Sequence, residues 1–289
     1  MKRIHSILLV MALALPTSVC MAQDPISKPV IIKDPNPVNK PKRKSGISKA
    51  DKERILHNLI NNMVWVEGGT FTMGATSEQG SDALDWQKPV HQVTLSSFSI
   101  GKYEVTQEEW EAVMGSNPSK FKGAKRPVER VSWDDCQEFI RKLNALTGKR
   151  FRLPTEAEWE FAARGGNLSQ GYMYAGGNSI DSVAWYNENS YNKGSNSPDY
   201  ETHPVGQKQS NELGLYDMAG NVKEWCQDWY DSSYYGRSPS TNPVNNASAY
   251  GRVNRGGCRY CLAGGCRVSN RGNYAPSHRG DDLGLRLVL

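Results

Sequence analysis

The sequence predicts an α+β domain with low regular secondary structure, built from short strands and a few capped helices. Three segments start with Ser or Thr and carry an acidic residue three positions later, which is the pattern that caps the first turn of a helix. Short apolar runs between these segments have the length and alternation of strands. Hydrophobic residues are only 38% of the 289 residues, while Gly numbers 27 and Trp 8, which is typical of loops held by aromatic side chains.

The same patterns place the expected elements. Strands are expected at 64–66, at 71–73 and within 91–100, and long surface loops after Gly166, where Gly, Asn, Ser and Tyr dominate. The second helix has one apolar face, formed by Cys136, Phe139, Ile140, Leu143 and Leu146. The capping pairs and the glycines that end the helices are Thr106 and Glu109 with Gly115, Ser132 and Asp135 with Gly148, and Thr155 and Glu158 with Gly165–Gly166.

Residues 1–22 have the form of a secretory signal peptide. Two basic residues precede an apolar stretch at 7–15, and small residues up to Ala22 form a cleavage site. The stretch is shorter than the roughly 20 residues that a membrane-spanning helix needs, so no transmembrane segment is expected beyond the signal. We therefore expect export to the periplasm or the extracellular space. Anchoring as a lipoprotein through Cys20 is the alternative, which the bulky Val19 before it disfavours.

A tether and a short helix separate the signal from the main domain. Residues 23–48 contain five Pro among Lys and Asn, with little to bury, which is typical of a semi-extended linker. A helix is expected over 49–62 with Ser48 as its cap, followed by the domain itself over 63–289. At roughly 230 residues, this domain is long enough for one large core.

The positive charge of the chain is concentrated in its first 52 residues. They hold ten Lys or Arg and three Asp, a net charge of +7, so the formal net charge of +5 leaves −2 for residues 53–289. The domain is therefore not basic, and we expect no nucleic-acid partner. We expect a monomer.

Five segments of the domain form an ordered set of motifs. They are Met63-Val-Trp-Val-Glu-Gly-Gly-Thr-Phe-Thr-Met-Gly74; Pro89-Val-His-Gln-Val-Thr94 with Tyr103-Glu-Val-Thr106; Arg126-Pro-Val-Glu-Arg-Val-Ser-Trp133; Phe151-Arg-Leu-Pro-Thr-Glu-Ala-Glu-Trp-Glu160; and Asn211-Glu-Leu-Gly-Leu-Tyr-Asp-Met-Ala-Gly-Asn-Val222. Together with Arg255-Gly-Gly257 and Leu283-Gly-Leu-Arg286, this set resembles the formylglycine-generating enzyme (sulfatase-modifying factor) family over the whole of 63–289. The resemblance implies that family's C-type-lectin-like fold.

The resemblance also implies a copper- and oxygen-dependent oxidation of a cysteine in an exported sulfatase to formylglycine, on a segment of the form Cys-x-Pro-x-Arg. In the family, two cysteines that lie four and nine residues after a Gly-Gly pair bind copper. Cys261 and Cys266 stand at that spacing after Gly256–Gly257. Thiolates are soft ligands that suit monovalent copper. Cys261 and Cys266 are thus the candidate catalytic and copper-binding residues of an oxidoreductase.

Other interpretations of these cysteines stay open. An oxidising compartment favours a disulfide between Cys261 and Cys266 when no metal is present, and a cluster without chemistry is a further possibility. Zinc is disfavoured because the three clustered thiols lack a fourth ligand. Catalytic members of the family carry Ser after the Gly-Gly pair and Trp before the Glu-Trp pair. This chain has Cys258 and Lys223 there, and both departures count against oxidase activity.

A structural calcium site is a further implication of the resemblance. In the family, the loop that corresponds to Asp217, Gly220, Val222 and Glu224 supplies carboxylate and carbonyl oxygens. Oxygens of these kinds are the ligands that calcium prefers. The alternative is that the two carboxylates brace the loop without a metal.

The isolated histidines and two further cysteines are expected to be structural. No histidine cluster could form the triad of the related ergothioneine-type iron oxidases, so that iron class is set aside. His91 is expected to make a structural hydrogen bond, and Cys136 and Cys226 to be small buried hydrophobes. His203 and His278 are expected in loops.

A non-catalytic hypothesis for 258–282 competes with the oxidase. In C-type-lectin-like proteins, this part of the chain can form a ligand face that diversity-generating retroelements vary at asparagine codons. Each candidate residue here can be encoded from an AAC codon by changing its adenines alone. This hypothesis makes the chain an exported binding protein and requires the segment to be surface-exposed. The candidate ligand residues are Arg259, Tyr260, His278, Asp281 and Asp282.

Overall fold

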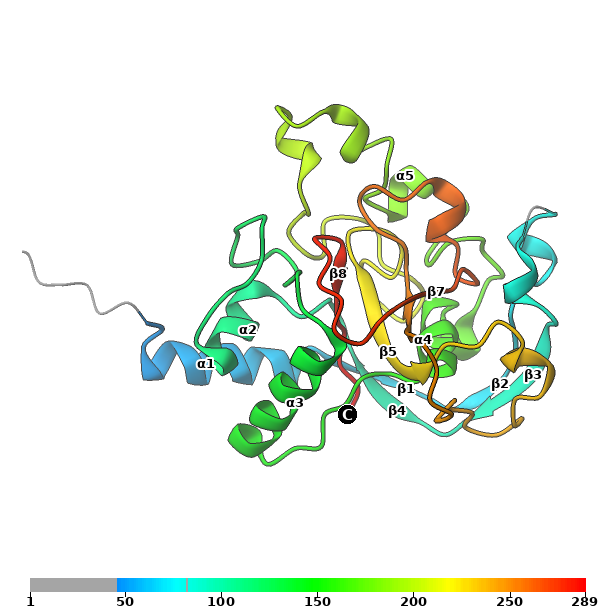
Figure 1. The fold of residues 1–289 in the computed structure, drawn as a ribbon, viewed down its shortest axis with the longest axis horizontal. Coiled ribbons are helices and arrows are strands. Elements are labelled where there is room, and N and C mark those ends of the chain that lie inside the picture. Colours follow the sequence, from blue (N-terminus) through cyan, green and yellow to red (C-terminus); the bar gives the residue numbers. More distant parts are fainter. Residues whose placement is uncertain (1–45, 82) are drawn as a thin grey trace, which may run out of the picture. The chain divides into compact units, whose positions relative to one another are not determined.

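The computed structural model describes residues 46–81 and 83–289 (Figure 1). The signal peptide predicted at 1–22 and the linker up to residue 45 lie outside the described residues. Within the described part, no helix is long and apolar enough to cross a membrane.

Five α-helices occur among the described residues, and their ends follow the capping chemistry that the sequence predicts. In α2, α3 and α4, the N-cap hydroxyl accepts a backbone N–H from the residue three positions on, whose carboxylate accepts the N-cap N–H in return. Gly115 and Gly148 end α2 and α3 in the left-handed conformation that favours glycine. The helices are α1 Lys49–Asn61, α2 Gln107–Met114, α3 Trp133–Thr147, α4 Glu156–Ala163 and α5 Ile180–Val183.

Eight short strands form three small sheets in the described part of the chain. β1 pairs antiparallel with β4, and β2 pairs antiparallel with β3. The third sheet has the order β7-β6-β5-β8, in which β5 and β8 are parallel and the other pairs antiparallel. The strands are β1 Met63–Val66, β2 Gly69–Met73, β3 His91–Leu95, β4 Phe98–Gly101, β5 Lys223–Trp229, β6 Arg252–Arg255, β7 Gly272–Tyr274 and β8 Leu283–Gly284.

The sequence patterns located the first two sheets but not the third. The segment 91–100 is divided into β3 and β4 by the exposed Ser96 and Ser97. Strands β5 to β8 lie beyond Gly166, where loops were expected, so that expectation is wrong for these strands. β5 is buried or half-buried on both faces, which removes the apolar–polar alternation that identifies a half-exposed strand.

Helix α4 lies at the centre of the packing. It is buried along its whole length and contacts β2, β5 and β6 (Figure 1). Trp159 of α4 and Trp225 of β5 have no exposed surface and belong to two different hydrophobic clusters. Burying a large side chain contributes on the order of 2–3 kcal/mol. Trp159 also lies against Gly256, and Lys223 at the start of β5 is part of the site described below.

The chain between α4 and β5 is a long irregular region with short helical turns, drawn in green to yellow-green in Figure 1. Its turns bring aromatic side chains toward the segment after β6. The 3-10 turns of the described residues are Ser77–Gln79, Asp85–Gln87, Gly166–Leu168, Tyr191–Lys193, Pro198–Tyr200, Tyr234–Gly236 and Ala263–Cys266.

Candidate functional site: a disulfide turn beside a tyrosine pocket

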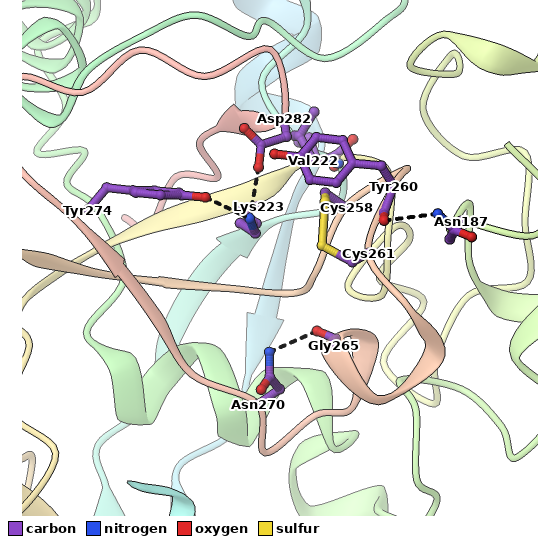
Figure 2. Close-up of a disulfide and its surroundings, with 11 residues drawn as sticks. Asn187, Val222, Lys223, Cys258, Tyr260, Cys261, Gly265, Asn270, Tyr274 and Asp282 are labelled. Carbon is purple, nitrogen blue, oxygen red and sulfur yellow. Dashed lines mark hydrogen bonds and ion pairs between the residues drawn. A yellow bond between two sulfur atoms is a disulfide. The ribbon is translucent and has the colours of Figure 1, made fainter. Parts of the chain in front are cut away.

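A disulfide closes a tight turn just after β6. Cys258 and Cys261 are joined, with their Cα atoms 5.0 Å apart, and Arg259 and Tyr260 lie between them (Figure 2). The Cys261 N–H donates to the Cys258 carbonyl at 2.9 Å, and the side-chain amide of Asn187 donates to the Tyr260 carbonyl at 3.2 Å. Cys258 is buried and Cys261 is half-buried. These four residues are called the disulfide turn below.

Cys266 lies near the disulfide turn as a free, buried thiol. It ends the turn Ala263–Cys266 and belongs to an apolar cluster against which Cys261 packs. Burial raises the pKa of Cys266 to about 12, although the backbone N–H groups of Cys258 and Gly220 hydrogen-bond to the sulfur and favour the thiolate. Gly257 has a φ of +75°, and a Cβ there would lie 2.7 Å from this sulfur, so glycine is required.

These positions correct one interpretation of the sequence. The disulfide joins Cys261 to Cys258 and not to Cys266, whose thiol faces the backbone of Gly257 and Cys258 instead. Copper ligation by Cys261 and Cys266 needs two free thiolates. The residues as placed therefore do not fit a copper ion while the Cys258–Cys261 bond is intact.

Lys223 forms a polar cluster next to the disulfide turn (Figure 2). Its ammonium donates to Asp282 at 2.8 Å and to the Tyr274 hydroxyl at 3.0 Å, and lies 5.5 Å from the ring centroid of Tyr260. Burial disfavours the charged form, but the attraction of Asp282 and the hydrogen bonds to Asp282 and Tyr274 together outweigh it, so the pKa of Lys223 is above its ordinary value. A charged and paired side chain therefore lies beside the disulfide turn, at the position where the resemblance described above implies a tryptophan in catalytic proteins, whose indole would be apolar.

A pocket of about 400 Å³ opens beside the disulfide turn. Tyr191, 42% exposed, lies at its rim, with its ring centroid 5.2 Å from that of Tyr200 and 6.0 Å from that of Tyr260. Phenol rings thus form much of its wall. The residues that line this tyrosine pocket are Lys120, Tyr191, Tyr200, Arg259, Tyr260 and Asp281.

Arg259 organises the pocket from within the protein. Only 2% of the residue is exposed. Its Nη1 donates to the Tyr200 carbonyl at 2.9 Å, and its Nη2 lies 3.4 Å from Oδ2 of Asp281. Its Nε is enclosed and has no hydrogen-bond partner among the described residues. Rings surround the guanidinium carbon, those of Phe121, Tyr200, Tyr260 and Tyr191, at 4.5, 5.0, 5.5 and 5.7 Å from their centroids.

The structure brings together three of the five predicted ligand residues. Arg259, Tyr260 and Asp281 all line the tyrosine pocket. His278 does not line it; the His278 ring is exposed and stacks on Tyr274 with the centroids 4.3 Å apart.

The prediction that the whole segment 258–282 is surface-exposed is wrong. Cys258, Arg259 and Asp282 are buried. Asp282 is held in the ion pair with Lys223, and Arg259 by the rings and carbonyl around it. The exposed part of the ligand face is therefore smaller than the segment.

Sequence reasoning missed Lys120, Tyr191 and Tyr200. Lys120 lies after α2, and the two tyrosines lie on turns of the irregular region, so all three are far in sequence from the disulfide turn. The density of tyrosines in 186–200 is the only local signal, and no spacing rule connects it to residue 258.

The carboxylates predicted to hold calcium are already engaged. Glu224 accepts three hydrogen bonds from Nε and Nη2 of Arg286, the shortest at 2.7 Å, and one from Nε1 of Trp159 at 2.7 Å. Asp217 accepts the backbone N–H of Gly206 at 2.7 Å. Arg286 thus supplies the positive charge at Glu224, and the residues as placed do not fit a calcium ion there.

The backbone of the same loop is also engaged. The Gly220 N–H donates to the Gly256 carbonyl at 2.8 Å, and the Val222 N–H donates to Glu104 at 3.1 Å. Burial raises the pKa of Glu104 well above its ordinary value and that of Asp217 to about 6. No group of three or more His, Cys, Asp or Glu side chains suited to a metal occurs in 46–81 or 83–289. These contacts favour carboxylates that brace the loop without a metal.

The two other cysteines, His91 and His203 have contacts of the kind expected for structural residues. Cys136 and Cys226 are buried free thiols. Nδ1 of His91 lies 3.3 Å from the carbonyl of Pro89. His203 is buried in its loop and stacks on Trp185 with the ring centroids 3.6 Å apart, and burial lowers the pKa of His203 to about 4.

Comparison with known proteins shows which family this chain belongs to. The sequence model of the sulfatase-modifying factor enzyme 1-like domain matches residues 49–289. The chain belongs to the formylglycine-generating enzyme family. The α+β, C-type-lectin-like fold predicted from the sequence is that of the family, and this prediction is confirmed.

Members of the family that are similar to this chain have names that point to different roles. Chaperone protein LppX of Paenibacillus barcinonensis is 37% identical over 272 residues, which cover 80% of this chain and 90% of that protein. The formylglycine-generating enzyme of Streptomyces coelicolor is 29% identical over 282 residues, which cover 77% of this chain and 87% of the enzyme. The structure of Treponema denticola variable protein 1 matches with a TM-score of 0.68 at 35% identity, over 78% of this chain and 94% of that one.

Proposed function

We propose that this chain is a non-catalytic member of the family that binds a segment of another exported protein in the tyrosine pocket. One observation carries the proposal. The bond that occupies the sulfur of Cys261 also closes the turn that holds Arg259 and Tyr260 in the pocket wall. Cys261, one of the two residues that would carry the oxidation, is thereby part of the framework of a binding surface.

The residue types of the pocket favour a protein as the ligand. Four of its six lining residues are Tyr or Arg, the types enriched in the hot spots of protein interfaces. A tyrosine ring offers a large contact area and loses little side-chain entropy when it is fixed. The volume, about 400 Å³, is within the usual range of small-molecule pockets, so the pocket is sized for a small part of a bound segment.

The names of two similar proteins are compatible with a binding role. LppX is named a chaperone, and chaperones bind other proteins. The Treponema denticola protein is named a variable protein, which suits a ligand face that differs between copies. Export, as predicted from residues 1–22, would place the partner of this chain among exported proteins.

Selection from a displayed library of random extended peptides tests this proposal. The oxidised wild-type chain serves as bait, and fluorescence anisotropy gives the affinity of the enriched peptides. Tyr191→Ala is expected to lower the affinity for these peptides about tenfold or more, because truncating a hot-spot tyrosine removes buried contact area. Tyr250→Ala is the matched control, since Tyr250 is 83% exposed and does not line the pocket. A library without enriched peptides, or peptides that bind both variants equally, would overturn the proposal.

Copper-dependent oxidation by the reduced chain is the second candidate function. Cys261 packs against the cluster that contains the free thiol of Cys266, so reduction of the disulfide would leave both candidate copper ligands, Cys261 and Cys266, as thiols in one region, with Cys258 as a third. The similarity to the enzyme of Streptomyces coelicolor favours this candidate, whereas Lys223 and Cys258 count against it. The reduced, copper-supplied chain is incubated in air with a Cys-x-Pro-x-Arg peptide, and mass spectrometry follows the change from thiol to aldehyde. No conversion, under conditions where an active family member converts the peptide, ends this candidate.

A further inference from the structure

We propose that the tyrosine pocket recognises one carboxylate, carried by an acidic side chain of the bound protein segment. The inference rests on the proposed function and names the chemical class that this site takes. It follows from the hydrogen bonds that Arg259 lacks, from the charge balance of the lining, and from the enclosure of the guanidinium.

Arg259 has more donors than acceptors around it. A guanidinium carries five N–H donors and no acceptor. Here one carbonyl lies at 2.9 Å, one carboxylate oxygen lies at 3.4 Å, and the enclosed Nε has no partner among the described residues. Enclosed donors without a partner destabilise a folded protein. Nε is enclosed, so the donors that a ligand oxygen in the pocket would meet are the N–H groups of Nη1 and Nη2 that the contacts with Tyr200 and Asp281 leave unused.

The lining carries one positive charge in excess. Lys120 and Arg259 face a single carboxylate, that of Asp281, which Lys120 contacts at 2.6 Å. Lys223 and Asp282, next to the pocket, pair with each other and add no net charge. One excess positive charge matches a ligand group with one negative charge. A doubly charged phosphate would exceed this balance and be repelled by Asp281.

The surroundings of Arg259 strengthen such a contact. Four aromatic rings exclude water from the guanidinium, and hydrogen bonds between charged groups gain strength where water is excluded. A planar carboxylate matches the planar fork of a guanidinium, and an alkyl or aromatic stem would lie against the tyrosine rings.

Benzoate and benzamide are a matched pair of probes for this inference. They have the same shape, and only benzoate is charged. The oxidised full chain with labelled tyrosine rings is titrated with each probe, and NMR follows the ring signals of Tyr191, Tyr200 and Tyr260. Benzoate is expected to shift these signals to saturation, and benzamide to bind about tenfold more weakly or worse, because it lacks the charge-assisted hydrogen bonds.

Variants at the rim avoid the risk that a change at buried Arg259 unfolds the protein. Lys120→Met is expected to lower the affinity for benzoate several-fold, because a positive charge is removed. Asp281→Asn is expected to raise the affinity for benzoate, because the competing carboxylate is removed. Lys122→Met is the matched control, since Lys122 is exposed, two residues away, and does not line the pocket. Its benzoate affinity is expected to equal that of the wild type.

The outcomes separate this inference from the proposed function. Equal binding of benzoate and benzamide at the three rings would overturn the carboxylate inference and leave the pocket as a binding site. Absence of any ring shift with benzoate would also overturn it. In the peptides selected for binding to the chain, replacing the acidic residue by its amide is expected to lower the affinity about tenfold. Peptides that bind the pocket but tolerate that replacement would again refute the carboxylate and support the function.

Discussion

Buried arginines connect loops of the domain through fully buried carboxylates. Arg286 pairs with Glu224 at 2.7 Å, and Arg271 pairs with Glu156 at 2.6 Å. Each arginine also donates to backbone carbonyls, so its guanidinium connects several loops at once. Removing one member of a buried pair leaves the other charge without compensation, which costs roughly 3–5 kcal/mol.

Glu224→Gln is therefore expected to lower the free energy of unfolding by about 3–5 kcal/mol, measured by urea denaturation. Glu138→Gln is the control, because Glu138 pairs with Arg141 and Lys142 on the exposed surface of α3, where solvent screens such pairs and they contribute little. Because Arg286 already balances Glu224, a chelator is expected to leave the melting temperature of the wild type unchanged. A clear fall of the melting temperature in the presence of the chelator would support a calcium ion in this loop.

His203 makes a contribution to the stability whose pH dependence has a known sign. Its pKa is lowered to about 4 by burial, whereas an unfolded chain takes up the proton near 6.5. Between these values the unfolded state binds more protons, so the contribution of His203 is complete above pH 6.5 and is lost as the pH falls toward 4. Asp217, with its pKa raised to about 6, acts in the opposite direction over part of this window. His203→Phe, which keeps a ring beside Trp185, is therefore expected to show a smaller loss of stability between pH 7 and 4 than the wild type. Equal losses in denaturation curves would contradict the assignment.

The disulfide turn is the element that connects the core to the pocket. Its backbone is bonded to Asn221 through the Arg259 N–H at 2.9 Å and to Asn187 through the Cys261 carbonyl at 3.0 Å. The covalent bond closes a loop of only four residues, from Cys258 to Cys261. Loop-closure entropy for so short a loop corresponds to about 2 kcal/mol of stabilisation.

The double variant Cys258→Ser/Cys261→Ser is expected to have a free energy of unfolding that is lower by about 2 kcal/mol, measured by urea denaturation. It is also expected to bind pocket ligands more weakly, because Arg259 and Tyr260 lose their covalent constraint. Reductant is expected to weaken binding by the wild type and to leave the double variant unchanged. That difference separates the effect of the bond from other effects of reductant. Unchanged affinity in the reduced wild type would show that the bond does not hold the pocket.

Local chemistry explains which elements could be predicted. The caps of α2, α3 and α4 depend on residues three positions apart, so the sequence was sufficient to find them. The spacing after Gly256–Gly257 pointed to Cys261 and Cys266, but the bonding partner depends on how the turn directs its Cβ atoms. The tyrosine pocket is formed by the loop after α2, the irregular region, the disulfide turn and Asp281, and only tertiary packing brings these together.

At the scale of the whole molecule, the last seven residues connect elements from across the chain. β8 pairs with β5, and the backbone beyond it accepts hydrogen bonds from Val105, Gly101 and Arg152 at 2.8–2.9 Å. The side chains of this segment belong to both main hydrophobic clusters. Its fully or almost fully buried apolar residues are Leu283, Leu285, Leu287 and Val288.

Removal of residues 283–289 is therefore expected to abolish cooperative unfolding. Four buried aliphatic side chains contribute on the order of 6–12 kcal/mol, which is comparable with the whole stability of a typical domain. Loss of Arg286 would in addition leave Glu224 unpaired inside the protein. Circular dichroism during heating measures the transition, and removal of the half-buried Leu289 alone is the graded control, which should lower the melting temperature yet keep a cooperative transition. A cooperative transition of the shorter chain near the wild-type temperature would mean that this segment only covers the core and does not hold it together.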